Sequence, residues 1–150
     1  MSGCCSGQKR VLVELEYLVV GGETCDRCGG TREETRAAVL DAAGLLSGVG
    51  IAVDLVEREI PPSKIAQSNR VLVNGIPAET WVGGHAVMTG CSTCEDLVGG
   101  GPACCRAIEV NGVQTEVITR EVVVDAIMAA AGLAPGHVTK VTLVTAGDCG

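Results

Sequence analysis

Aromatic and positively charged residues are both scarce in this chain. Its 150 residues include no phenylalanine, one tryptophan and one tyrosine. This composition argues against a β-sandwich built on aromatics and leaves Val, Leu, Ile and Ala to fill the interior, which suits helices packed on a sheet. Lys and Arg number 11 against 18 Asp and Glu, for a net charge of −7. We therefore expect no nucleic-acid partner, because phosphate contacts need clustered Lys and Arg.

Long hydrophobic runs are also absent. No stretch approaches the ~18 uninterrupted apolar residues of a membrane-spanning helix. Residues 1–5 begin no positive region followed by an apolar run, so they do not predict a secretory signal. We expect a cytoplasmic protein with no membrane partner. The 47% hydrophobic content of the 150 residues is enough for one domain with a sizeable core.

Cysteine, by contrast, is abundant, with nine residues in the chain. In a reducing compartment a framework of disulfides is disfavoured, and metal binding or redox chemistry is the better interpretation of so many thiols. The odd number leaves at least one thiol outside any pairing. The nine residues are Cys4, Cys5, Cys25, Cys28, Cys91, Cys94, Cys104, Cys105 and Cys149.

The first half of the chain predicts a strand, a helix and a second strand. Residues 10–20 combine β-branched side chains with an apolar run too short for a helix, which is typical of a buried strand. Thr31 and Glu34 have the spacing of a capping box, so we expect the helix to begin at Thr31. Residues 51–60 alternate apolar and polar side chains, as a second strand does. If the two strands are parallel, their crossover must be right-handed.

An Asn-Gly turn follows in the second half. Asn74-Gly75 predicts a hairpin between strands at residues 70–73 and 76–82, because Asn-Gly is the strongest short-range hairpin signal. The glycine-rich residues 83–102 indicate a loop. A further hairpin is expected around Asn111-Gly112.

The last predicted helix begins after Thr119, which is a suitable N-cap, and it ends at Gly132. Residues 138–145 are a candidate edge strand. These elements suggest an α/β fold with a thioredoxin-like βαβ-ββα core, a Cys/Gly-rich insertion and an extra hairpin. The expected division is a flexible tail at residues 1–9, one domain at 10–135 with the insertion at 83–106, and an extension at 136–150.

Two kinds of chemistry are open to the first cysteine pair. Cys25 and Cys28 can close a disulfide, which needs one thiolate of lowered pKa and a second thiol to resolve the mixed disulfide. They can also chelate a soft ion together with ligands from elsewhere. Arg27 would stabilise thiolate charge, whereas Asp26 and Glu23 would oppose it. The glycines on both sides predict an exposed, tight loop.

The second cluster supplies four more sulfurs, from Cys91, Cys94, Cys104 and Cys105. Four thiolates suit zinc or an iron–sulfur centre. Adjacent residues rarely bind one ion without strain, so one member of the 104–105 pair can instead face the first dithiol. A structural staple for a loop with little apolar content is the competing interpretation. His85 is a candidate nitrogen ligand, although a solvated histidine is more common in a glycine loop.

Arg106 follows the second thiol pair directly. Its guanidinium can lower thiolate pKa values or hold an oxyanion. A surface salt bridge explains it equally well.

Four motifs together resemble one protein family. They are Thr24-Cys25-x-x-Cys28, Ser68-Asn69-x-Val71-Leu72-Val73-Asn74-Gly75, Cys91-x-x-Cys94 and Cys104-Cys105-Arg106. Together they resemble the domain of unknown function DUF2703, over about residues 10–133. The resemblance implies a glutaredoxin-like core with a cysteine-rich insertion, and it implies no established reaction.

Two features depart from ordinary thioredoxins. A helix that begins at Thr31 would leave Cys25 a turn ahead of the helix end, with less stabilisation of its thiolate by the helix dipole. Thioredoxins also carry a cis-proline opposite the dithiol, where this chain has Ser68-Asn69-Arg70. In the wider superfamily that proline shields the cysteines from metal ions, so its absence favours coordination.

Three functions remain open at this point. The favoured one is binding of a soft metal or metalloid ion such as zinc, mercury, arsenic or copper, for metal handling or detoxification; an iron–sulfur cluster is less favoured. The second is a thiol–disulfide oxidoreductase acting on a protein or small-molecule disulfide, in which Cys25 attacks, Cys28 resolves and Cys104-Cys105 relays. The third is a non-catalytic domain with a structural zinc. Under any of the three, Cys4-Cys5 is either a mobile thiol pair that hands an ion or electrons to the main site, or two chance cysteines in a tail.

Overall fold

The computed structural model describes residues 9–99 and 103–133. The predicted edge strand at residues 138–145, the pair Cys4-Cys5 and Cys149 lie outside these residues. The elements, in chain order, are β1 (Lys9–Leu18), α2 (Asp26–Ser47), β2 (Ile51–Ile60), the 3-10 helix η1 (Pro62–Gln67), β3 (Arg70–Val73), β4 (Ile76–Pro77), α3 (Ala78–Trp81), β5 (His85–Gly90), α4 (Ser92–Leu97), β6 (Cys104–Val110), β7 (Val113–Thr115) and α5 (Arg120–Ala130).

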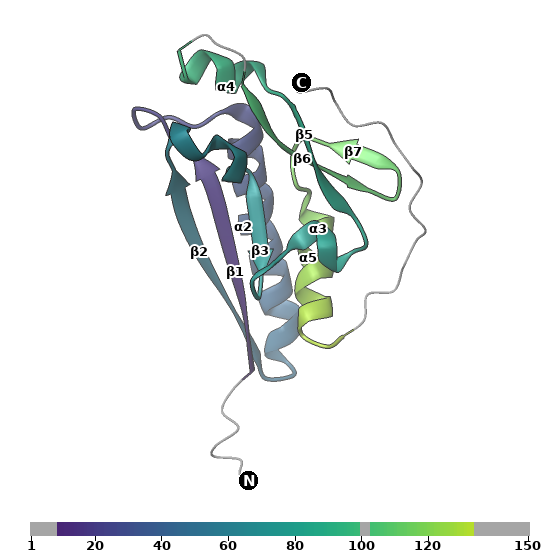
Figure 1. Ribbon diagram of the computed structural model, residues 1–150. Helices are drawn as coiled ribbons and strands as arrows, with labels where there is room; N and C mark the ends of the chain where they lie inside the picture. The colour runs from purple at the N-terminus through teal and green to yellow at the C-terminus, as the bar shows by residue number, and fades with distance from the viewer. Residues whose placement is uncertain (1–8, 100–102, 134–150) are drawn as a thin grey trace.

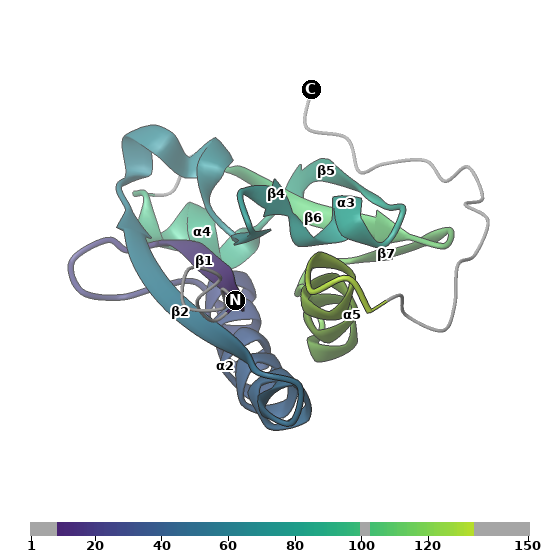
Figure 2. The ribbon, with the colours of Figure 1, turned by 90° about the horizontal axis from the view of Figure 1, so that it is seen from below.

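The strands form two sheets in a mixed α/β fold (Figure 1). The first sheet has the order β2-β1-β3-β4, with β1 parallel to β2 and antiparallel to β3. The predicted strand-helix-strand unit is therefore confirmed, and its two strands are parallel. The second sheet has the order β5-β6-β7 and is antiparallel throughout. Figure 2 shows α2 along the four-stranded sheet and α5 beside α2.

The core follows from the alternation of side chains along β1. Val11, Val13 and Leu15 are buried, and Leu12 between them is exposed, because successive strand residues point to opposite faces. On α2, Ala38, Ala42 and Leu46 recur every four residues and are fully buried in the same cluster. Aliphatic residues and alanine thus fill most of the interior, as the scarcity of aromatics predicts.

The predicted start of the first helix is wrong. The helix α2 begins at Asp26, and Cys25 is its N-cap, with its Sγ accepting from the backbone N–H of Cys28 at 3.4 Å. Glycines at positions 29 and 30 suggested a break, yet they lie inside the helix. A Cβ on Gly30 would lie 2.8 Å from Val117 Cγ2, so this glycine permits a close contact between segments.

The residues of the expected capping box hold a different contact. Thr31 is buried within α2, and its Oγ1 accepts from the backbone N–H of Ile118 at 3.0 Å. Glu34 accepts from the backbone N–H of Arg120 at 2.8 Å. The two side chains thus fix α2 to the start of α5 rather than capping α2.

The segment from residue 76 to residue 102 also differs from expectation. The strand predicted at 76–82 is the two-residue β4 followed by α3, and the predicted loop contains β5 and α4. Gly84 explains part of the error, because a Cβ there would lie 2.4 Å from the backbone oxygen of Glu109. This glycine lies in the short connection between α3 and β5 and permits the close approach to β6. The turns at Asn74-Gly75 and Asn111-Gly112 are as predicted, with positive φ at all four residues.

Within the described residues, no helix is both long enough and apolar enough to cross a membrane.

Candidate metal centre

Five free cysteines that lie in separate segments of the chain gather in the interior. Cys25 and Cys28 come from the start of α2, Cys91 and Cys94 from the start of α4, and Cys105 from β6, and all five are buried. The Sγ atoms of Cys25, Cys91 and Cys94 all lie within 4.8 Å of one another. This buried three-sulfur group can hold a metal ion. The two cysteine clusters of the sequence are therefore one site.

The three-sulfur group depends on how α4 meets α2. Cys91 ends the segment after β5, with its backbone N–H donating to the carbonyl of Ala103 at 3.1 Å. Cys94 lies three residues on, which places both side chains on one side of the helical turn. Thr93 Oγ1 accepts from the backbone N–H of Asp26 at 3.2 Å, so the two Cys-x-x-Cys segments contact each other directly.

Residues 104 and 105 separate because β6 alternates its side chains. Cys105 is fully buried, and its Sγ lies 2.9 Å from Cys94 Sγ. Cys104 precedes it on the strand, so its side chain points to the opposite face. Of the adjacent pair, Cys105 is therefore the member that reaches the other thiols.

The expected exposed loop at the first pair is wrong. Cys28 is fully buried and Cys25 is 2% exposed. The backbone N–H of Leu18, at the end of β1, donates to Cys28 Sγ at 3.5 Å. Burial follows because α4 and the start of β6 lie against the beginning of α2.

Hydrogen bonds divide four of the thiols into two pairs. The Cys28 thiol holds the pKa of Cys25 well below its usual range, and contacts from Cys94 add to this against the opposing effect of burial. The same bond to Cys25, together with burial, raises the pKa of Cys28.

The second pair behaves alike. The bond to Cys105, followed by the bond to Cys25 and burial, raises the pKa of Cys94. That bond lowers the pKa of Cys105, and the charge of Arg27 contributes to the lowering. These hydrogen bonds thus favour the thiolate at Cys25 and Cys105 and the thiol at Cys28 and Cys94.

Arg27 lies beneath this site with a buried guanidinium. Its Nη1 donates to Thr89 Oγ1 at 2.8 Å and to the carbonyl of Cys105 at 3.1 Å, and its Nη2 donates to the carbonyl of Gly90 at 2.8 Å. Nη2 also pairs with Glu116 at 3.2 Å, whose side chain is mostly exposed. Arg27 therefore fixes the ends of β5 and β6 to α2. In addition to the bond from Cys94, its charge lowers the pKa of Cys105, while its expected effect on Cys25 and Cys28 stays a prediction.

Arg106 and His85 have other partners. Arg106 is buried and donates through Nη2 to Glu79 Oε2 at 2.7 Å, so its salt bridge is internal rather than on the surface. It points away from Cys105 because neighbouring strand residues alternate. His85 opens β5 and lies 3.5 Å from Glu109, about 17 Å of extended strand before Gly90. It is therefore no ligand of the three-sulfur group.

The expected position of the thioredoxin proline is occupied by a polar bridge. Asn69 is buried with φ at +57°, and no cis peptide bond occurs in the ranges described. Its Nδ2 donates to the carbonyl of Arg106 at 2.6 Å and to the carbonyl of Glu116 at 2.8 Å. Asn69 thus joins the start of β3 to the second sheet beside the site, a role that the sequence did not signal.

A pocket of about 330 Å³ opens onto the site. It is lined by Asp26, Arg27, Gly90, Cys91, Ser92, Thr93 and Glu116. Cys91 is the member of the three-sulfur group that borders it, so an ion can reach the other sulfurs past Cys91. Two carboxylates and one arginine border the opening, which gives a net negative charge suited to the entry of a cation.

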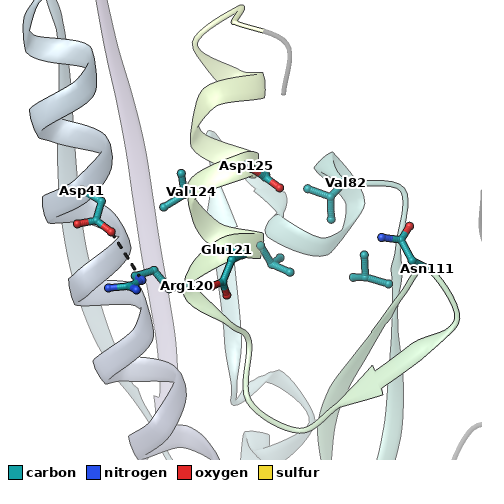
Figure 3. Close-up of a pocket in the computed structure, with 9 residues that line it drawn as sticks. Asp41, Val82, Asn111, Arg120, Glu121, Val124 and Asp125 are labelled. Atoms are coloured by element: carbon teal, nitrogen blue, oxygen red, sulfur yellow. Dashed lines mark ion pairs between the residues drawn. The ribbon is translucent and has the colours of Figure 1, made fainter. Parts of the chain in front are cut away.

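A larger cavity, of about 620 Å³, lies elsewhere, around the first turns of α5 (Figure 3). Val82, Val110 and Asn111 line it together with residues of α5. At its other side Arg120 Nε lies 3.6 Å from the carboxylate of Asp41 on α2. No cysteine of the described chain borders this cavity, so it is separate from the thiol site.

Comparison with known proteins gives a family and no reaction. A family model described as "Domain of unknown function (DUF2703)" matches residues 11–127. An "Uncharacterized protein" of Archaeoglobus fulgidus is 37% identical over 119 residues, which cover 76% of this chain and 82% of the relative. No solved structure matches the chain.

Proposed function

The chain belongs to the DUF2703 family, and we propose that it binds one thiophilic metal or metalloid ion through the thiolates of Cys25, Cys91 and Cys94. The observation that carries the proposal is the mutual approach of these three buried Sγ atoms, all within 4.8 Å. Three soft ligands from two separate segments suit zinc, copper(I), mercury or arsenic(III), because thiolates select soft ions.

The spacing of the sulfurs supports direct coordination. With zinc–sulfur bonds of about 2.3 Å, tetrahedral ligands lie about 3.8 Å apart. Sulfurs that are already within 4.8 Å of one another need only small side-chain movements to reach that spacing. A solvent molecule from the pocket beside Cys91 can supply a fourth ligand.

The pocket favours handling of the ion over a purely structural staple. Structural zinc sites are closed, whereas a site that exchanges its ion needs an open approach. Cys91 borders a pocket that carries the carboxylates of Asp26 and Glu116. The protein therefore takes up the ion and releases it again, in metal handling or detoxification in the cytoplasm.

A thioredoxin-like core is part of the proposal. The sheet order β2-β1-β3-β4, with a parallel crossover through α2 and antiparallel β3, supports it. The N-cap position of Cys25 supports it as well, since a helix N-terminus stabilises a thiolate there. In this arrangement the β5–α4–β6 segment is the insertion that supplies Cys91, Cys94 and Cys105.

The test is ion binding by the reduced full-length chain under anaerobic conditions. Zinc, cadmium, copper(I), mercury(II) and arsenite should be titrated separately, and at least one should bind with a stoichiometry of one. Cys91→Ser should lose that binding, whereas Cys104→Ser, which changes the neighbouring face of β6, should retain it. Equal affinities in the two variants, or no binding of any of these ions, would contradict the proposal.

A second candidate function is thiol–disulfide exchange at Cys25 and Cys28. It is favoured by the position of Cys25 as the N-cap of α2, three residues before Cys28. The contact between the two thiols lowers the pKa of Cys25 and raises that of Cys28, which suits attack by Cys25 and resolution by Cys28. A Cys28→Ser variant would then accumulate a mixed disulfide with a disulfide substrate. A Cys25→Ser variant would accumulate none.

A further inference from the structure

Cys94 can take part in two kinds of sulfur chemistry that exclude each other. It belongs to the three-sulfur group with Cys25 and Cys91. It also lies 2.9 Å from Cys105 Sγ, and both thiols are free and fully buried. A sulfur in a disulfide is no longer a thiolate and gives up its place as a metal ligand.

We propose that Cys94 and Cys105 are a reversible redox pair, oxidised by an external disulfide through Cys91, and that formation of their disulfide expels the ion from the three-sulfur group. The redox pair rests on the contacts of these thiols alone, whereas the release of the ion rests on the proposed function.

The geometry of the pair favours bond formation between these two sulfurs. A disulfide bond is about 2.05 Å long, so Cys94 and Cys105 need to approach by less than about 1 Å. Cys105 lies outside the three-sulfur group, so its sulfur stays available while an ion is bound to the others. The guanidinium of Arg27 donates to the carbonyl of Cys105 at 3.1 Å and fixes the backbone of that residue beside Cys94.

Access from solvent runs through Cys91. Neither Cys94 nor Cys105 is among the residues that border the 330 Å³ pocket, whereas Cys91 is. An external disulfide of the form R–S–S–R′ therefore meets Cys91 first.

The exchange balances in three steps. The Cys91 thiolate attacks R–S–S–R′, which forms a Cys91–S–S–R mixed disulfide and releases R′S⁻. Cys94 then attacks Cys91 Sγ, forming a Cys91–Cys94 disulfide and releasing RS⁻. Cys105 attacks Cys94 Sγ, which yields the Cys94–Cys105 disulfide and restores the Cys91 thiolate. In total, the sulfurs of Cys94 and Cys105 lose two electrons to form one disulfide bond, and the external disulfide gains them and leaves as RS⁻ and R′S⁻. Any proton that Cys94 or Cys105 carried passes to these two products.

The first experiment locates the disulfide in the ion-free, full-length chain. After treatment with oxidised glutathione and alkylation of the remaining thiols, peptide mass spectrometry should find Cys94 linked to Cys105. An end product linked between Cys91 and Cys94 or between Cys25 and Cys28, or a chain whose thiols stay reduced, would overturn the proposal. This outcome is independent of any metal.

The second experiment measures release, with cadmium as the probe followed by its thiolate charge-transfer absorption. Oxidised glutathione should discharge cadmium from the native chain and from Cys104→Ser. Cys105→Ser and Cys105→Ala should bind cadmium, and their oxidation should stop at the Cys91–Cys94 disulfide, whereas the native chain should end with Cys91 as a free thiol that can be alkylated. A Cys105 variant that ends with Cys91 free, or a native chain that ends with Cys91 blocked, would overturn the coupling. If the reduced native chain binds no cadmium, the proposed function and the release fail together, while the mapped disulfide still decides the redox pair.

Discussion

Replacing Arg27 with methionine tests whether a buried cation holds the site together. Methionine keeps most of the aliphatic stem and removes the guanidinium. The change leaves Thr89 Oγ1 and the carbonyl of Cys105 buried without their donor, while the carbonyl of Gly90 is only partly buried and can regain water from the pocket. Glu116 is left in solvent, so its loss of a partner matters little.

The magnitude follows from these partners. Hydrogen bonds to a charged group contribute about 1.5–3 kcal/mol each. Three buried acceptors lose their bond to Arg27, and the carbonyl of Arg106 keeps its bond from Asn69. Removing the arginine also removes the cost of burying its charge, which offsets part of the loss. We expect the free energy of unfolding to fall by about 3 kcal/mol, which is the low end of the range for the bonds to Thr89 and Cys105 together.

The assay is urea unfolding of the reduced, ion-free chain, compared with Arg36→Met. Arg36 forms a two-pronged ion pair with Glu57, at 2.6 and 2.8 Å, on the exposed face of α2. An exposed pair of this kind contributes less than about 1 kcal/mol. If Arg27→Met lowers the free energy of unfolding no more than Arg36→Met does, the guanidinium does not hold β5 and β6 to α2, and the reasoning is refuted.

Three further predictions concern packing, pH and ion binding. Gly84→Ala should lower the free energy of unfolding by about 1–3 kcal/mol, because the new Cβ would lie 2.4 Å from the backbone oxygen of Glu109. Gly44→Ala is the control. No atom lies within 4 Å of a Cβ at that position of α2, so this variant should be neutral or stabilising in the same urea assay. The bond from Arg36 lowers the pKa of Glu57. The native chain should therefore be more stable than Glu57→Gln above the unfolded-state pKa of this carboxyl, and it should lose this advantage as the pH falls through the folded-state pKa. A difference in Tm between the two chains that stays constant across several pH values would contradict this. A bound ion at 100 times its Kd should stabilise the chain by about 2.7 kcal/mol, so a strong chelator should lower the Tm of the loaded chain, and an unchanged Tm would argue against binding to the folded state.

Local sequence patterns predicted the elements whose causes are local. The β1–α2–β2 unit and the two Asn-Gly turns were predicted because side-chain alternation and positive φ depend on nearby residues. The start of α2 was missed because Gly30 reflects contact with Val117, which lies far along the chain. A glycine that relieves a tertiary contact and a glycine that breaks a helix look alike in sequence.

The sequence identified the cysteines of the candidate site, but it did not predict that Cys25, Cys91 and Cys94 lie together in one group. Spacing reports ligands within one segment, whereas the contact of Asp26 with Thr93 that joins the two Cys-x-x-Cys segments arises only from the tertiary fold. The sequence analysis placed residues 104 and 105 in an insertion and assigned no strand there. In a strand, side chains alternate between the two faces, so only one of the two cysteines can face Cys94. Asn69 and Thr89 gave no local signal, since their partners are backbone carbonyls and a buried guanidinium from other elements.

The two sheets share no hydrogen-bonded strand pair in the described ranges, and this gives the thiol site a mechanical consequence. Cys25 belongs to the layer built on the first sheet, while Cys91 and Cys94 belong to the segment between two strands of the second. An ion held by all three would add a cross-link between these layers to the bonds that Arg27 and Asn69 already make. Loading would then slow local opening at this junction, so hydrogen exchange at the ends of β5 and β6 would slow together with exchange at the start of α2.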